Sequence, residues 1–95
     1  MQFFMVPSFL PWIEPDDYEA FRWLMPDNSD IPDAYDKWRV LTLEEIAEQQ
    51  AMGFAVKTVV VYPFEFSRYC HNKNATPNSA ALWNFAFQKA TLNLD

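Results

Sequence analysis

One segment constrains what this chain can fold into more than any other, because it carries the only strong strand signal. Residues 56–62 read Val-Lys-Thr-Val-Val-Val-Tyr, in which valine and threonine predominate, and β-branched residues favour extended backbone. Gly53 and Pro63 bound the segment. The backbone groups of a strand need partners, because an unpaired buried group costs about 1–3 kcal/mol. A second strand must therefore come from this chain or from another molecule.

The chain itself offers one weak partner, a short strand at residues 3–6. Residues 2–12 are apolar but contain Pro7 and Pro11, a pattern that predicts an extended segment laid over the core. If that internal pairing fails, we expect residues 56–62 to pair antiparallel with the same segment of a second copy, around a two-fold axis. A homodimer packed through the last helix is the alternative. The residues expected in this homodimer interface are Val56, Val60, Tyr62, Trp83 and Phe87.

Helix signals precede the strand. Pro15 suits the first helical position, and Asp16 and Asp17 favour the positive end of a helix dipole. A further helix is expected over residues 33–52, either continuous or divided near Thr42, where a capping box begins. Gly53, the only glycine, is expected in the left-handed conformation that ends this helix.

Two more helices are expected after the strand. Pro63 opens the first, which ends within residues 72–75, and Thr76 with Pro77 signals the start of a last helix running to about Ala90. The fold class is thus α+β and mostly helical, with one central strand at residues 56–62 followed by two helices and preceded by two or three. We expect a single domain over residues 1–95, with an acidic helical part at 1–55 and a strand-helix-helix part at 56–95.

The net charge of −6 is divided unevenly between these parts. Residues 1–55 hold nearly all the carboxylates, whereas residues 56–95 carry four of the seven lysines and arginines against Glu65 and Asp95. Two interpretations stay open: the carboxylates cap and solubilise helices, or the two parts meet partners of opposite charge. The apolar N-terminus lacks the basic start of a signal peptide, no apolar run is long enough to span a membrane, and a cytoplasmic location is expected.

The order strand, helix, turn and capped helix over residues 56–90 resembles the ribbon-helix-helix family of DNA-binding dimers. Residues 56–62 match the ribbon, Pro63 opens the first helix, and residues 74–79 match the turn and second cap. The resemblance implies that paired ribbons from two chains read the major groove and that the second helix start binds a phosphate. The implied DNA contacts are Lys57, Thr58 and Val59 in the ribbon and Thr76, Asn78 and Ser79 at the helix start.

The titratable residues give little sign of catalysis or metal binding. Cys70 and His71 are adjacent and would point about 100° apart on a helix, so we expect a buried thiol and a surface imidazole rather than a catalytic pair. The four tryptophans are expected to anchor the core, with Trp12 as an alternative contact for a partner. No enzyme activity and no cofactor are expected.

Two functions from different classes remain. The first is a small homodimeric DNA-binding regulator or antitoxin-like protein of ribbon-helix-helix type. The second is a protein-interaction module with an acidic docking face and no nucleic-acid contact.

Overall fold

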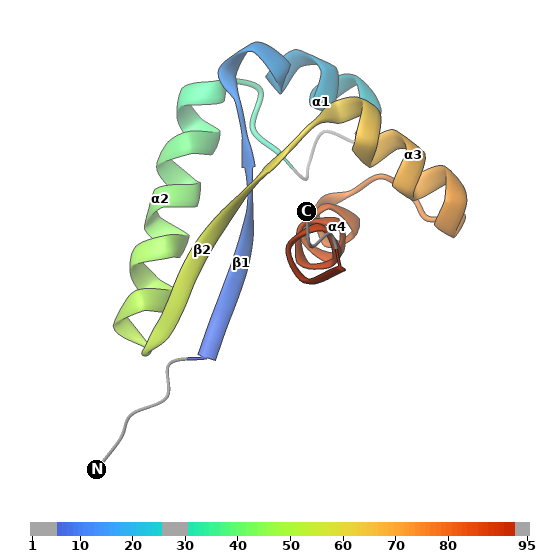
Figure 1. The fold of residues 1–95 in the computed structure, drawn as a ribbon. Coiled ribbons are helices and arrows are strands. Elements are labelled where there is room, and N and C mark those ends of the chain that lie inside the picture. Colours follow the sequence, from blue (N-terminus) through green and yellow to red (C-terminus); the bar gives the residue numbers. More distant parts are fainter. Residues whose placement is uncertain (1–5, 26–30, 93–95) are drawn as a thin grey trace.

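The computed structural model describes residues 6–25 and 31–92, and they form an α+β fold in which a two-stranded sheet lies between helices (Figure 1). Helix α2 lies on one side of the sheet and α4 on the other, with α1 and α3 near one end of the strands (Figure 1). The elements in chain order are β1 (Val6–Ile13), a 3₁₀ turn (Pro15–Asp17), α1 (Tyr18–Leu24), α2 (Tyr35–Ala51), β2 (Phe54–Val61), α3 (Pro63–Lys73) and α4 (Ser79–Leu92).

The sheet corrects the expectation of a single strand. β1 and β2 pair in parallel along their whole length, from Val6 opposite Phe54 to Ile13 opposite Val61. The expected strand at residues 56–62 is therefore real but begins at Phe54 and ends at Val61. The expected partner at residues 3–6 overlaps the observed one at Val6, where β1 begins and then continues to Ile13, and residues 3–5 lie outside the described part of the chain. The argument that β2 finds no partner within its own chain is wrong.

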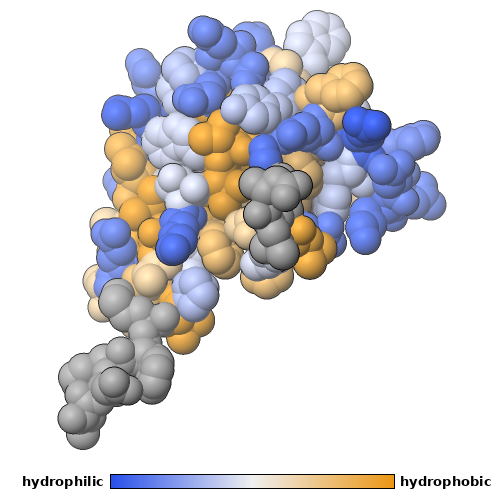
Figure 2. Space-filling model, in the orientation of Figure 1, coloured by the Kyte–Doolittle hydropathy of each residue, from blue (hydrophilic) through white to orange (hydrophobic). Residues whose placement is uncertain are grey.

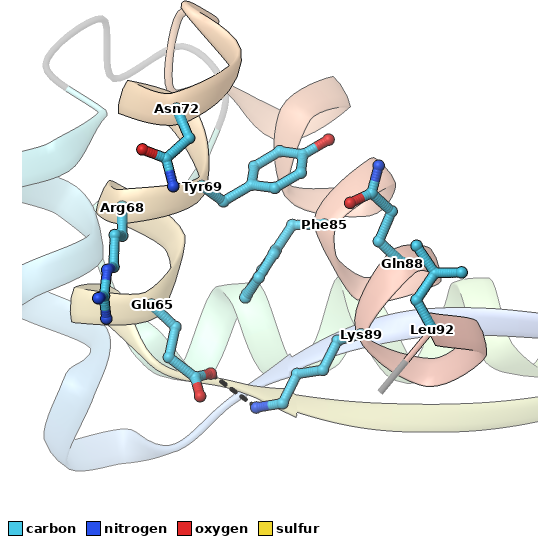
Figure 3. Close-up of a pocket in the computed structure, with 8 residues that line it drawn as sticks. All are labelled: Glu65, Arg68, Tyr69, Asn72, Phe85, Gln88, Lys89 and Leu92. Carbon is cyan, nitrogen blue, oxygen red and sulfur yellow. Dashed lines mark hydrogen bonds and ion pairs between the residues drawn. The ribbon is translucent and has the colours of Figure 1, made fainter. Parts of the chain in front are cut away.

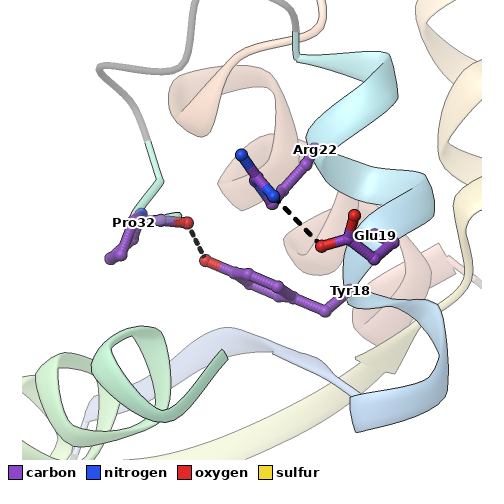
Figure 4. A network of polar contacts seen from close by, with 4 residues as sticks. All are labelled: Tyr18, Glu19, Arg22 and Pro32. Carbon is purple, nitrogen blue, oxygen red and sulfur yellow. Dashed lines mark hydrogen bonds and ion pairs between the residues drawn. The ribbon is translucent and has the colours of Figure 1, made fainter. Parts of the chain in front are cut away.

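The start signal at Pro15 is confirmed, and the first helix is anchored by a tyrosine. Pro15 begins the 3₁₀ turn that leads into α1. The hydroxyl of buried Tyr18 donates to the carbonyl of Pro32 over 2.5 Å, which ties α1 to the segment before α2 (Figure 4). Burial is the main cause that raises the pKa of Tyr18 to about 12. On the outer side of α1, Arg22 pairs with Glu19 at 3.1 Å (Figure 4).

Helix α2 is continuous, which resolves the alternatives at Thr42. It runs from Tyr35 to Ala51 with Thr42 in its interior, so the capping box does not start a new helix. The glycine prediction is confirmed, because Gly53 has φ +96° directly after the helix. This turn reverses the chain and leads directly into β2.

The two C-terminal helices begin and end differently from each other. Pro63 opens α3 as expected, and Asn74 ends it in the left-handed conformation with φ 56°. The start predicted at Thr76 and Pro77 is wrong, because α4 begins at Ser79. The Oδ1 of Asn78 accepts a hydrogen bond from the amide of Ala81 at 2.9 Å, so asparagine caps this helix instead.

The core lies between the sheet and helices α1, α3 and α4. Phe21 and Phe66 are fully buried, with ring centroids 5.9 Å apart, and Ile13 and Val61 reach the same cluster from the ends of the strands. On the other face of the sheet, Trp38 is buried against Trp12. Trp23 does not anchor the core, since 83% of it is exposed.

Candidate interaction surface

The two edges of the sheet differ because β1 contains two prolines. Successive backbone amides along a strand point to opposite edges. Pro7 and Pro11 are four residues apart, so their backbone nitrogens lie on the same edge. A proline on the inner edge would interrupt the hydrogen bonds to β2, yet the pairing is continuous past both positions. Pro7 and Pro11 therefore lie on the edge of β1 that faces away from β2. That edge has lost two of its amide donors.

The same alternation of backbone groups between the two edges determines which groups of β2 face outward. Even-numbered residues of β1 bond to β2, and odd-numbered residues of β2 bond back to β1. The amides and carbonyls of Phe54, Val56, Thr58 and Val60 consequently point to the other side, which we call the outer edge of β2. Among the described residues, one protein hydrogen bond reaches these groups, from Lys89 to the carbonyl of Val60.

Lys89 closes one end of the outer edge. Its Nζ on α4 donates to the carbonyl oxygen of Val60 at 2.9 Å and to Glu65 Oε1 at 2.7 Å. The ammonium also lies 4.7 Å from the ring centroid of Tyr62. Three partners from β2, the following residue and α3 therefore fix this side chain. The open part of the edge runs from Phe54 to Thr58.

The middle of β2 is uncovered on both faces. Adjacent residues of a strand point to opposite faces, and the side chains of both Lys57 and Thr58 are exposed. Helix α2 contacts β2 and also reaches β1, where its Gln49 accepts a hydrogen bond from Ser8. Helix α4 contacts both strands, and its Phe87 packs on Phe9 with ring centroids 6.0 Å apart. The exposed side chains of β2 are therefore those in the middle of the strand, at Lys57 and Thr58.

Exposed apolar side chains stand at both ends of β2. Met52, just before the strand, is 68% exposed. Tyr62, just after it, is 46% exposed, and Phe64 follows at 74%. In the orientation of Figure 1, apolar side chains gather in the middle of the visible face and are bordered by hydrophilic ones (Figure 2). Such residues are candidates for burial against a partner.

The expected dimer-interface residues fall on two separate surfaces. Val56 and Val60 belong to the outer edge of β2, and Tyr62 follows it. Trp83 and Phe87 lie on the side of α4 that faces β1: Phe87 contacts Phe9, and Trp83 lines a cavity of about 180 Å³ with Pro11 and Leu41. The structure does not bring the five together in one patch.

The expected DNA contacts are likewise distributed over two regions. Lys57 and Thr58 are exposed on opposite faces of β2, while Val59 packs against the core. Thr76 is exposed before α4, Asn78 uses its side chain to cap that helix, and Ser79 is its first, half-buried residue. In this single chain β2 pairs in parallel with β1, and the antiparallel ribbon that the resemblance implies stays a prediction.

A cavity of about 420 Å³ lies between α3 and α4 (Figure 3). Tyr69 and Phe85 contribute neighbouring rings with centroids 5.2 Å apart, and the Glu65–Lys89 ion pair stands at one end. The lining has no cysteine, serine or histidine, so it offers none of the usual nucleophile–base pairs. The complete lining is Glu65, Arg68, Tyr69, Asn72, Phe85, Gln88, Lys89 and Leu92.

Cys70 and His71 behave as the sequence predicts. Cys70 is 4% exposed, and burial raises the pKa of its thiol, which disfavours the reactive thiolate. His71 is exposed. Both border a cavity of about 510 Å³ beside Leu24, but no hydrogen bond joins them. Within residues 6–25 and 31–92, no three carboxylate, histidine or cysteine side chains are arranged to hold a metal ion.

Sequence reasoning missed the decisive feature of this surface. The sequence pattern around Pro7 and Pro11 predicts only an extended segment over the core, whereas their spacing of four residues is the signal of a protected strand edge. No helix in the described ranges is both long and apolar enough to cross a membrane. Comparisons of the chain with protein-family models, with curated proteins and with solved structures found no match.

Proposed function

We propose that this chain is a non-enzymatic protein-interaction module that binds an extended backbone segment along the outer edge of β2. The observation that carries the proposal is the contrast between the two sheet edges. Prolines remove donors from the edge of β1, whereas the edge of β2 keeps its amides and carbonyls from Phe54 to Thr58. Extended segments add to such open edges through main-chain hydrogen bonds, and pockets beside the edge supply specificity.

The surroundings of the edge support the same function. The exposed residues beside it are apolar at both ends, and Lys57 is the only charged side chain on β2. Proteins commonly guard exposed edges with charges, prolines or bulges to prevent unwanted pairing. This chain guards β1 with two prolines and leaves β2 with a single lysine, a difference that favours a binding role for β2.

Peptide selection tests the proposal without assuming a natural partner. Random peptides displayed on phage are selected on the immobilised protein, and a selected peptide is labelled and titrated by fluorescence anisotropy. Amide hydrogen exchange is then followed by NMR. We expect the amides of Val56 and Thr58 to exchange rapidly in the free protein and to become protected when the peptide binds.

Thr58→Pro is the matched edge variant. It removes an outward amide, and its ring occupies the edge, so peptide affinity should fall about tenfold or more. Thr58→Ala keeps the amide and should retain affinity. Equal binding by the proline variant, protection confined to other elements, or a selection without binders would each refute the proposal.

Duplex DNA distinguishes this function from the ribbon-helix-helix alternative. An interaction module predicts no gel shift of random duplex even at low salt. A shift that vanishes as salt rises and that is lost in Lys57→Ala would support DNA binding instead, because phosphate contacts depend strongly on salt.

A further inference from the structure

We propose that the segment received by the outer edge of β2 is β2 of a second copy, in an antiparallel register centred on Val56. This inference rests on the proposed function and names its partner. It makes a four-stranded sheet in which the two β2 strands are the inner pair. Thr58 lies opposite Phe54 of the partner, and Val56 lies opposite Val56 of the partner.

The Val56 register suits the groups that face outward. In alternate opposed pairs of an antiparallel ladder the two residues exchange two hydrogen bonds. The outward backbone groups of Phe54, Val56 and Thr58 have no hydrogen bond within residues 6–25 and 31–92. A register centred on Thr58 would need the carbonyl of Val60, which Lys89 already holds at 2.9 Å. The Val56 register uses the open part of the edge and leaves this contact intact.

Charge disfavours the third register, which is centred on Lys57. Centring on Lys57 would place that lysine directly opposite the same residue of the second chain, and like charges opposed across strands destabilise the pair. It would also use the carbonyl of Val60. In the Val56 register Lys57 lies opposite the partner's Ala55, so the repulsion is avoided.

The apolar side chains at the strand ends favour a second copy as the occupant. In an antiparallel pair the start of one strand meets the end of the other. Met52, 68% exposed before β2, is then brought beside Val60 of the partner and near Tyr62, which is 46% exposed after it. Each copy supplies both halves of this contact, as a two-fold interface requires.

Light scattering coupled to gel filtration tests the assembly. The chain of 11.2 kDa should elute with twice that mass at high concentration, and Thr58→Pro should elute as a monomer. A wild-type monomer at the highest soluble concentration, or a dimer that persists in Thr58→Pro, would overturn the inference. Peptide binding by a monomeric wild-type protein would leave the proposed function standing, so the two failures are distinguishable.

Cysteine cross-linking tests the register in a Cys70→Ala background. Directly opposed hydrogen-bonded residues have Cα atoms about 5.5 Å apart, which suits a disulfide. With oxidised glutathione, the two thiols of a Val56→Cys dimer should form one disulfide and release two reduced glutathiones. Thr58→Cys should not cross-link, because the two cysteines would lie about 13 Å apart along the strands. The reverse result would refute the Val56 register.

Discussion

Lys89 and Val60 are joined across 29 residues of sequence by a hydrogen bond of 2.9 Å from the lysine ammonium to the backbone carbonyl. The lysine comes from α4 and the carbonyl from the outer edge of β2, so this contact fastens the last helix to the strand. The side chain of Lys89 is only 19% exposed, and this burial strengthens its charge-assisted bond relative to one at the surface. The bond also determines where the open edge ends.

Replacing Lys89 by methionine should destabilise the fold. The variant keeps an apolar stem but loses the bonds to Val60 and Glu65, and hydrogen bonds to charged groups contribute about 1.5–3 kcal/mol. We expect a decrease of about 1–2 kcal/mol in the free energy of unfolding, measured by urea titration. Glu65→Gln is the control, with a decrease below about 1 kcal/mol because that carboxylate is partly exposed. Equal stability of Lys89→Met and wild type would contradict the role given to this contact.

Proline substitutions at two neighbouring positions should have opposite outcomes. The amide of Lys57 faces β1 and donates to the carbonyl of Ser8, whereas the amide of Thr58 faces outward. Both side chains are exposed, so the variants differ mainly in the backbone bond that they remove. Lys57→Pro should cost about 1–3 kcal/mol in urea unfolding, and Thr58→Pro less than about 1 kcal/mol.

This comparison also checks the assignment of the edges. The two variants could lose comparable free energy of unfolding, or Thr58→Pro could lose more when measured on the monomer. Either result would show that the residues of β2 that bond to β1 are assigned incorrectly. Circular dichroism of both variants should be recorded before the titrations, so that a change of fold is recognised.

Tyr18 should make stability depend on alkaline pH. Burial raises its pKa to about 12 in the folded state, above the ordinary value of 10.0. Because the folded pKa is the higher one, the contribution of the neutral phenol is complete below pH 10 and is lost as pH rises from 10 to about 12. Tyr18→Phe lacks this ionisation and the bond to Pro32, so it should be about 0.5–1.5 kcal/mol less stable at neutral pH.

The difference between wild type and Tyr18→Phe should shrink, and then change sign, between pH 10 and 12. Urea titrations at several pH values measure it directly. A difference that stays constant over this range would mean that the phenol is not desolvated in the folded protein.

Cys70 should react slowly with thiol reagents in the native protein. It is 4% exposed, and the raised pKa of its thiol keeps the thiolate scarce at neutral pH. With Ellman's reagent, we expect modification only at the rate of unfolding, and rapid reaction once urea is added. Thr58→Cys in the Cys70→Ala background is exposed and should react at once. Rapid native reaction of Cys70 would show that α3 opens readily.

Sequence reasoning located β2, Gly53 and the start of α3 because each depends on a local preference. Valine favours extended backbone, glycine tolerates a positive φ, and proline suits a first helical turn. The start of α4 was placed too early at Thr76, because two capping residues compete there. Asn78 takes the role through its contact with Ala81, a choice that depends on where the helix packs.

β1 was not predictable from the same preferences, and the candidate site depends on it. Pro7 and Pro11 count against a strand in any local scale, and they are tolerated here because both lie on the edge that bonds to no other strand in the described part of the chain. That direction is known only once the partner strand is known. The strand of the interaction surface was therefore predictable, but its free side was not. The exposure of Trp23 was also missed, because apolar character alone does not tell which face of α1 is covered.

The pair of prolines in β1 also limits how many subunits can join edge to edge. When two chains join through their β2 strands, each end of the combined sheet is a β1 strand whose outward donors are depleted, and a third molecule finds no matching row of amides. Association of this kind terminates at two subunits instead of extending into filaments.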